Sequence, residues 1–369
     1  MLTPQPTLLI GPSDWVAEVM PKEEFTGRIE ALWGINPEAP CAIVYGDRNH
    51  HAELAYLTNL VPKLEAAVAL LFPSGEHELY VGGGPNMLDA ARPLTWIPEL
   101  KPLRGGEAIG RRAAESRTDL PGVPLLIGGG YMPTALRQGI IDAIGETPLD
   151  ATAQVWTLMR RASAHELLAI REACVALAAA MEAITSAQEA GAGVTDAILT
   201  GERAANDRGA QDVRTLFSLN GGRTLVPFTT PIGDAVDPLQ VYLAVRRFNY
   251  WAEGFATMSK RRRPAAEKAH ELLGLALSTI RAGTDAADAA KLIAAAARPH
   301  RRHPVTERSF ANVIGLALEE PPHSDVGARF EAGAFYSVKV GVTDEVQSHA
   351  IVSAMIRIRD DGIETLWSA

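Results

Sequence analysis

The sequence has little cysteine, no long apolar run and no excess of positive charge, and each absence removes a class of protein. Only two cysteines occur among 369 residues, Cys41 and Cys174, so we expect neither a disulfide framework nor a thiolate metal site. No apolar run approaches the ~20 residues that a membrane-spanning helix needs. The formal net charge of −9 argues against a nucleic-acid-binding surface. We therefore expect neither a membrane nor a nucleic acid as a partner.

The first residues also lack the features of a targeting signal. The segment MLTPQPTLLIGPSDW has no basic region and is interrupted by prolines, so we expect a cytoplasmic protein. One basic cluster, Lys260–Arg263, stands out against the acidic composition. Four basic residues before Pro264 are typical of a solvated turn, and the alternative is a site for an anionic substrate or an acidic partner.

The chain is long enough for two domains and a large core, with 47% hydrophobic residues. Residues 1–155 have the pattern of an α/β unit, in which short apolar runs such as CAIVYG and AAVALLF are bounded by turn residues. We place the boundary near Ala151–Trp156. A long amphipathic helix follows, with Ser163 as its N-cap and Glu166 three residues later, which together form a capping box.

The stretch Asn220–Thr257 in the second part contains a Gly-rich turn and two strand patterns. The strands are expected over Leu239–Val245 and Phe248–Thr257, and the second carries a single carboxylate, Glu253. Two strands with alternate side chains pointing inward are a common way to line a site. The alternative is a pair of ordinary strands with one exposed Glu.

This stretch resembles the core of the creatinase, aminopeptidase P and prolidase superfamily. The family patterns S-G-x-N-x-x-x-P-H, G-D-x-V and G-Y-x-x-D are matched by Asn220-Gly221 through Pro227-Phe228, by Gly233-Asp234 and by Asn249–Glu253. The resemblance implies an α/β N-terminal domain of the creatinase type over residues 1–155. It also implies an α+β pita-bread domain over residues 156–369, and a symmetric homodimer.

The framework of the family is kept while its metal-site residues are replaced. The resemblance implies five ligand positions, occupied in the family by Asp, Asp, His, Glu and Glu. In this chain they hold Tyr242, Glu253, Asn312, Lys339 and Ser348. A divalent cation needs deprotonated carboxylates or neutral imidazoles around it. We therefore expect no metal, no other cofactor and no Xaa-Pro metallopeptidase activity.

Other groups at the inherited site still allow acid–base chemistry, which needs one or two groups of tuned pKa in a closed pocket. Within the resemblance, creatinase hydrolyses a C–N bond in this way without a metal. The candidate catalytic residues are Glu253, Glu320, His349 and Lys339. The candidate substrate-binding residues are Phe228, Tyr242, Arg246, Asn312, Glu319 and Ser348. Arg246, expected on the turn between the two strands, has the fork geometry that holds a carboxylate.

Two functions follow from these residues. The first is a metal-independent hydrolase or lyase that cleaves a C–N or related bond of a small amino-acid-like or amide-bearing substrate. The second is a catalytically inactive pita-bread domain that binds a peptide or protein. For the vacated metal site we expect Lys339 to pair with Glu253, with Tyr242 and Asn312 within hydrogen-bond reach, because a lone buried carboxylate is costly. The alternative is a Lys339 side chain that turns to solvent.

Overall fold

The computed structural model describes residues 14–63, 65–118, 120, 122–228, 230–303, 306, 310–318, 320, 328–344 and 348–369. Within these residues the chain divides into two compact units, and the division lies between Met159 and Arg160. The boundary expected after residue 155 falls inside helix α6, Thr152–Met159, which belongs to the first unit. No helix in the described part of the chain is both long enough and apolar enough to cross a membrane.

The first unit is a mixed sheet with helices. Its strands are β1 Ala42–Gly46, β2 Ala67–Leu71, β3 Glu78–Val81, β4 Glu99–Pro102, β5 Leu125–Ile127 and β6 Leu149–Asp150. Its helices are α1 Lys22–Ile35, α2 Ala52–Thr58, α3 Pro85–Ala91, α4 Gly106–Glu115, α5 Thr134–Ile144 and α6, with short 3-10 turns at Arg92–Leu94 and Ser116–Thr118. The strand order is β4-β3-β2-β1-β5-β6, in which β1–β2 and β2–β3 are antiparallel and the other pairs parallel.

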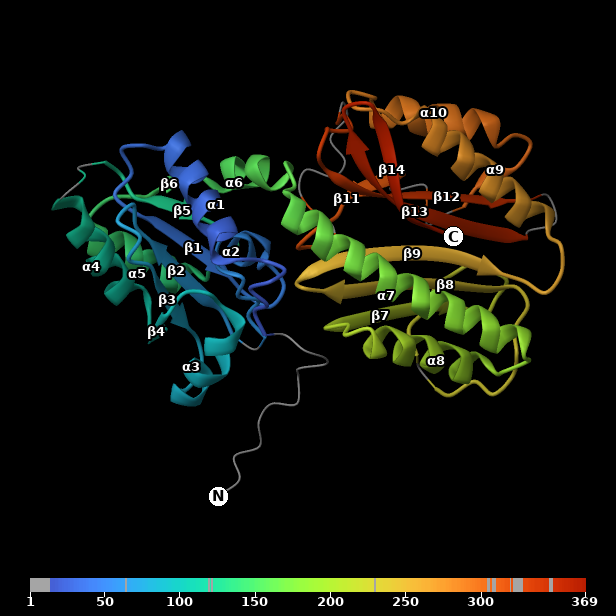
Figure 1. Cartoon of the computed structure of the whole chain (residues 1–369), viewed down its shortest axis with the longest axis horizontal. Helices are drawn as coiled ribbons and strands as arrows, with labels where there is room; N and C mark the ends of the chain where they lie inside the picture. The colour runs from blue at the N-terminus through green and yellow to red at the C-terminus, as the bar shows by residue number, and fades with distance from the viewer. Residues whose placement is uncertain are drawn as a thin grey trace, which may run out of the picture. The chain divides into compact units, whose positions relative to one another are not determined.

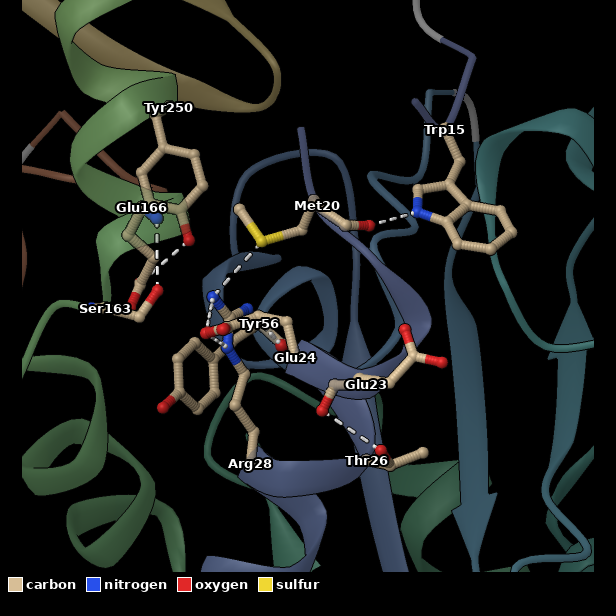
Figure 2. Close-up of polar contacts among 10 residues, drawn as sticks. All are labelled: Trp15, Met20, Glu23, Glu24, Thr26, Arg28, Tyr56, Ser163, Glu166 and Tyr250. Carbon is tan, nitrogen blue, oxygen red and sulfur yellow. Dashed lines mark hydrogen bonds and ion pairs between the residues drawn. The ribbon is translucent and has the colours of Figure 1, made fainter. Parts of the chain in front are cut away.

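Small residues and one buried arginine hold this unit together. Helices α4 and α5 approach closely because Gly106 and Gly110 leave no room for a Cβ against the α5 backbone. Arg28 of α1 is buried, donates to the Tyr56 carbonyl at 2.8 Å and lies over the Tyr56 ring (Figure 2). Because its Nη2 also pairs with Glu24 at 3.1 Å, this cation is satisfied and has a structural role.

The second unit contains two sheets and four helices in the described residues. The helices are α7 Ala164–Glu189, α8 Val194–Asp207, α9 Pro264–Thr279 and α10 Ala286–Ala296. The strands are β7 Asp212–Ser218, β8 Leu239–Arg247, β9 Tyr250–Met258, β10 Arg301–Arg302, β11 Ala311–Val313, β12 Phe335–Thr343, β13 His349–Arg359 and β14 Gly362–Ser368. One sheet has the order β7-β8-β9, and the other has the order β10-β12-β13-β14 with β11 also paired to β12.

Helix α7 starts as the sequence predicts. The Ser163 hydroxyl accepts from the Glu166 amide at 3.2 Å, and the Glu166 carboxylate accepts from the Ser163 amide at 2.9 Å. The second Glu166 oxygen accepts from the Tyr250 hydroxyl at 2.8 Å, so the cap also fixes the start of β9 (Figure 2). From there α7 runs along β8 and β9, with α8 beside it (Figure 1).

The strands of the second sheet have one apolar face and one polar face. Val338, Val340 and Val352 point to the core that is formed with α9 and α10. Their neighbours Lys339 and Ser353 alternate with them and therefore point to the opposite face. That face meets β9 of the first sheet, where the Phe255 amide donates to the Ser353 hydroxyl at 2.8 Å. The polar side chains of both sheets are thereby brought together.

Candidate functional site

A three-residue cluster lies where β8, β9 and β12 meet. The Glu253 carboxylate on β9 is 5% exposed and accepts a hydrogen bond from the Tyr242 hydroxyl of β8 through Oε2, at 2.8 Å. Its other oxygen, Oε1, lies 3.2 Å from Lys339 Nζ of β12, whose side chain is 14% exposed. This contact is an ion pair whose angles do not make a hydrogen bond. The predicted pairing of Lys339 with Glu253 is confirmed, and a Lys339 turned to solvent is excluded.

The surroundings of the cluster are aromatic and poorly solvated. The Tyr242 ring lies 4.7 Å from the Phe255 ring, and Lys339 Nζ lies 5.8 Å from the centre of the same ring. Burial, followed by the charge of Glu253, raises the pKa of Tyr242 well above its usual value. Tyr242 therefore remains a protonated donor at neutral pH and fixes one oxygen of Glu253.

Asn312 is close in the fold but is bound elsewhere. It lies on β11, opposite Ser337 of β12, and its Nδ2 donates to the Leu318 carbonyl at 2.9 Å. No hydrogen bond among the described residues joins it to Glu253, so that part of the expectation is not met. Its Oδ1 is buried without a hydrogen-bond partner in the same set. Asn312 thus contributes an open acceptor beside the cluster rather than a donor to it.

Ser353 lies beside the three-residue cluster, and the sequence motifs did not point to it. Ser353 is the direct partner of Lys339 in the β12–β13 ladder, and its side chain reaches β9. Ser348 precedes β13, where its amide donates to the Asp344 carboxylate at 2.7 Å. The sequence of β13 gives no clear signal for Ser353, because Ile351 and Met355 on the same face are apolar and the register of the strand is set by its pairing.

Glu320 supports the loop that follows β11. Its Oε1 accepts from the Leu316 amide at 2.8 Å, and its own amide donates to the Val313 carbonyl at 3.1 Å. Gly315 lies against this carboxyl group so closely that a Cβ would meet Oε1 at 2.5 Å. These contacts hold the loop whose Leu318 carbonyl binds Asn312. Glu320 is therefore a positioning residue in this geometry, not a free base.

His349 belongs to a separate group at the start of β13. Its Nδ1 lies 2.8 Å from the Thr343 hydroxyl, and its ring meets the His303 ring edge-on with centroids 5.5 Å apart. Burial, assisted by the charge of Arg223, lowers the pKa of His349. No contact in the described part of the chain connects His349 with Glu253. The two predicted catalytic groups are therefore not brought into one cluster.

Three further predicted residues have mixed placements. Phe228 is 36% exposed and packs on Phe217, with ring centroids 4.9 Å apart. Arg246 lies on β8 and not on a turn, because the turn is made by Phe248 and Asn249, which have φ of 48° and 68°. Glu319 lies outside the described residues.

The donors of this site do not fit a divalent metal ion. Among the described residues of the cluster Glu253 is the only carboxylate, its Tyr242 neighbour stays protonated, and an ammonium group already lies beside the carboxylate. Metal sites need several anionic or imidazole donors. Nowhere in the described ranges do three or more His, Cys, Asp or Glu side chains gather as a metal site would require. The Lys339 ammonium supplies the positive charge instead.

Solved structures share this architecture over nearly the whole chain. A prolidase from Pyrococcus horikoshii aligns with a TM-score of 0.71 and 14% identity, covering 94% of this chain and 98% of its own. The fold is the pita-bread fold. An X-Pro aminopeptidase from Thermotoga maritima aligns with a TM-score of 0.67 and 15% identity, covering 90% of this chain and 96% of its own. An aminopeptidase P from Escherichia coli aligns with a TM-score of 0.70 and 14% identity, covering 93% of this chain and 94% of its own. The predicted fold class, an N-terminal domain followed by a pita-bread domain, is confirmed.

The chemistry of this pita-bread chain has to be argued from its own residues. No family model matches the sequence, and no curated protein matches it. The structural neighbours are named as proline-specific peptidases, but identities of 14–15% establish the fold alone.

Proposed function

We propose that this chain is a hydrolase that cleaves the C–N bond of a small amide-bearing molecule without a metal ion, with Glu253 as its general base. One observation carries the proposal. The buried Glu253 carboxylate has one oxygen fixed by Tyr242, while the other lies beside the Lys339 ammonium and accepts no hydrogen bond. An oriented carboxylate with a free lone pair can act as a general base, and an adjacent cation can stabilise the negative charge that develops during hydrolysis.

The chemistry of each step follows from these two groups. Glu253 Oε1 accepts a proton from a water molecule as the water oxygen attacks the carbonyl carbon of the amide. The electron pair of the carbonyl moves to its oxygen, and the Lys339 ammonium stabilises that negative charge. When the intermediate collapses, the C–N bond breaks and the nitrogen takes the proton held by Glu253. The products are a carboxylic acid and an amine, and Glu253 is ionised again.

The placement of the cluster supports this proposal over a surface role for the same residues. Glu253 and Lys339 are both largely buried, and in a site that excludes water a charge stabilises a developing oxyanion far more than in bulk solvent. Two neutral residues lie on neighbouring ladder positions: Ser353 is paired with Lys339, and Asn312 is paired with Ser337 of β12 and has an open amide oxygen. These neutral groups are suited to orient a polar substrate without competing for the proton.

Turnover of a small-molecule panel in metal-free buffer tests the proposal. The panel contains N-acylated amino acids, dipeptides and guanidino compounds, each incubated with a chelator and followed by mass spectrometry. We expect wild type to hydrolyse at least one compound with the chelator present. Glu253→Gln should reduce the rate by about 100-fold or more, the usual contribution of a general base. Glu267→Gln, at an exposed surface pair, is the matched control and should retain the rate.

Two results would contradict the proposal. Hydrolysis that disappears with the chelator and returns with added metal would assign the activity to a metal. Ligands that raise the melting temperature by mass action, together with no turnover across the panel, would favour the alternative of a binding domain without catalysis.

A further inference from the structure

A buried arginine, Arg246, lies on the same face of the β7-β8-β9 sheet as Glu253. In the ladder β7-β8-β9, Arg246 pairs with Asp212 on one side and with Trp251 on the other. Directly opposed residues point to the same face of a sheet, and so do residues two apart along a strand. Trp251 and Glu253 therefore share the face of Arg246. Two residues of a strand advance by about 7 Å, which separates Arg246 from Glu253 by roughly the length of a small ligand.

Among the described residues, the Arg246 guanidinium has neither a hydrogen-bond partner nor an ion-pair partner. Arg246 is 6% exposed, its Nε is buried without a hydrogen bond, and none of the described ion pairs includes it. Its guanidinium carbon lies 5.3 Å from the centre of the Trp251 ring. Desolvation lowers the pKa of Arg246, with Asp212 opposing that effect. Buried guanidinium groups are normally paired, because an unpartnered charge is costly. This cation is therefore suited to an external partner.

A second arginine marks the edge of the same region. Arg214 of the edge strand β7 lies 4.7 Å from the centre of the Trp251 ring, and its side chain is 56% exposed. Its Nη2 lies 3.6 Å from Asp212 Oδ2, so the two side chains form a partly exposed ion pair. Trp251 is thus contacted by one exposed and one buried guanidinium. The exposed arginine places the solvent side of this region at β7.

The charges of this face select the ligand. The cations are Arg214 and Arg246 of this face and Lys339 of the facing sheet, and the anions are Asp212 and Glu253, so these five groups leave one positive charge. A monoanion neutralises that charge, whereas a phosphate dianion would leave an excess of negative charge next to Glu253. A planar carboxylate also matches the two-pronged fork of arginine.

We propose that Arg246, whose guanidinium lies over the Trp251 ring, is the binding residue for a carboxylate group of the ligand. The inference rests on the proposed function in that it names the acidic group which the Glu253 substrate would carry. The subsite is built on β7, β8 and β9, and the amide would extend from it toward Glu253 and Lys339. Specificity for an acid over its neutral amide follows from this arrangement, since the neutral amide leaves the buried cation unpaired.

Calorimetric titration of the full chain with two matched probes tests the subsite. The probes are N-acetylglycine and its neutral analogue N-acetylglycinamide, with inorganic phosphate as a third ligand. We expect wild type to bind the acid at least about tenfold more tightly than the amide, as a charged hydrogen-bonded pair provides. Arg246→Met should remove that preference and Arg246→Lys should reduce it. Arg359→Gln, at an exposed pair with Asp361, should retain it. Equal binding of acid and amide, a preference that survives Arg246→Met, or tighter Arg246-dependent binding of phosphate would overturn the inference.

Thermal unfolding without ligand separates a binding role from a structural one. Without ligand, a buried cation that has no ion-pair partner destabilises the folded protein through its desolvation cost. Arg246→Met should therefore leave the melting temperature unchanged or raise it. A fall of more than about 3 °C, the equivalent of a lost structural interaction in a chain of this size, would show that Arg246 stabilises the fold instead.

The subsite and the hydrolase can fail separately. Carboxylate binding without any turnover would contradict the hydrolase and support the subsite. Turnover of neutral amides with no preference for acids would support the hydrolase and contradict the subsite.

Discussion

At the level of single residues, the proposed site depends on the ion pair between Glu253 and Lys339. Glu253 is a buried carboxylate, and Lys339 supplies the compensating cation, with Nζ 3.2 Å from Oε1. Removing both charges together costs little in many proteins, whereas removing one partner leaves the other buried and unpaired. The change in unfolding free energy on removing one charge therefore shows whether Glu253 and Lys339 stabilise each other or are merely close in space.

Replacing Lys339 by Met should destabilise the protein by about 3–5 kcal/mol, the usual effect of breaking a buried ion pair. Urea unfolding measures this change, and Lys339→Met combined with Glu253→Leu should recover at least half of it. Lys291→Met, which breaks an exposed pair with Asp288, is the control and should change stability by less than about 1 kcal/mol. Equal effects of Lys339→Met and Lys291→Met would show that the pair near Tyr242 has no special energetic role.

At the scale of elements, the two sheets of the second unit are joined at β9 and β13 by side chains. The Thr257 hydroxyl donates to the Ile351 carbonyl at 2.9 Å and accepts from the Ile351 amide at 2.8 Å. Together with the contact from Phe255 to Ser353, these bonds fix how far β9 lies along β13. That offset determines whether Lys339 reaches Glu253.

Thr257→Val should cost about 2 kcal/mol, because a side chain of similar shape leaves the buried amide and carbonyl of Ile351 without partners. The same change at Thr200, whose hydroxyl bonds within an exposed helix, should cost less than about 0.5 kcal/mol. Chemical denaturation of both variants provides the comparison. If Thr257→Val is as stable as Thr200→Val, the hydroxyl does not hold the two sheets together.

The sequence predicted elements better than it predicted the site. The capping box at Ser163 and the strand patterns around Glu253 depend on local spacing, and both are found. The sequence predicts a strand that begins at Phe248, whereas Phe248 and Asn249 form the turn, because positive φ at an aromatic residue is rare and is not expected from its side chain. Ser353 was missed because its position depends on the register of a hairpin. The unpartnered state of Arg246 depends on residues from three strands, which no local pattern reveals.

At the scale of the whole molecule, we expect a homodimer, as the resemblance to creatinase-type proteins implies. Light scattering combined with size-exclusion chromatography should then give twice the chain mass of 39.5 kDa. A mass equal to one chain across a dilution series would contradict the prediction. The measurement also bears on the site, because a dimer gives each chain a second surface from which to complete it.

We infer that the Lys339 ammonium supplies, next to Glu253, the positive charge that a metal ion would otherwise supply. Calorimetric titration of metal-free protein with Mn²⁺, repeated with Zn²⁺, tests it most directly. We expect no binding that depends on Glu253, so that wild type and Glu253→Gln give the same featureless titration, because Lys339 repels a second cation from the Glu253 carboxylate. Stoichiometric binding by wild type that is lost in Glu253→Gln would contradict the account.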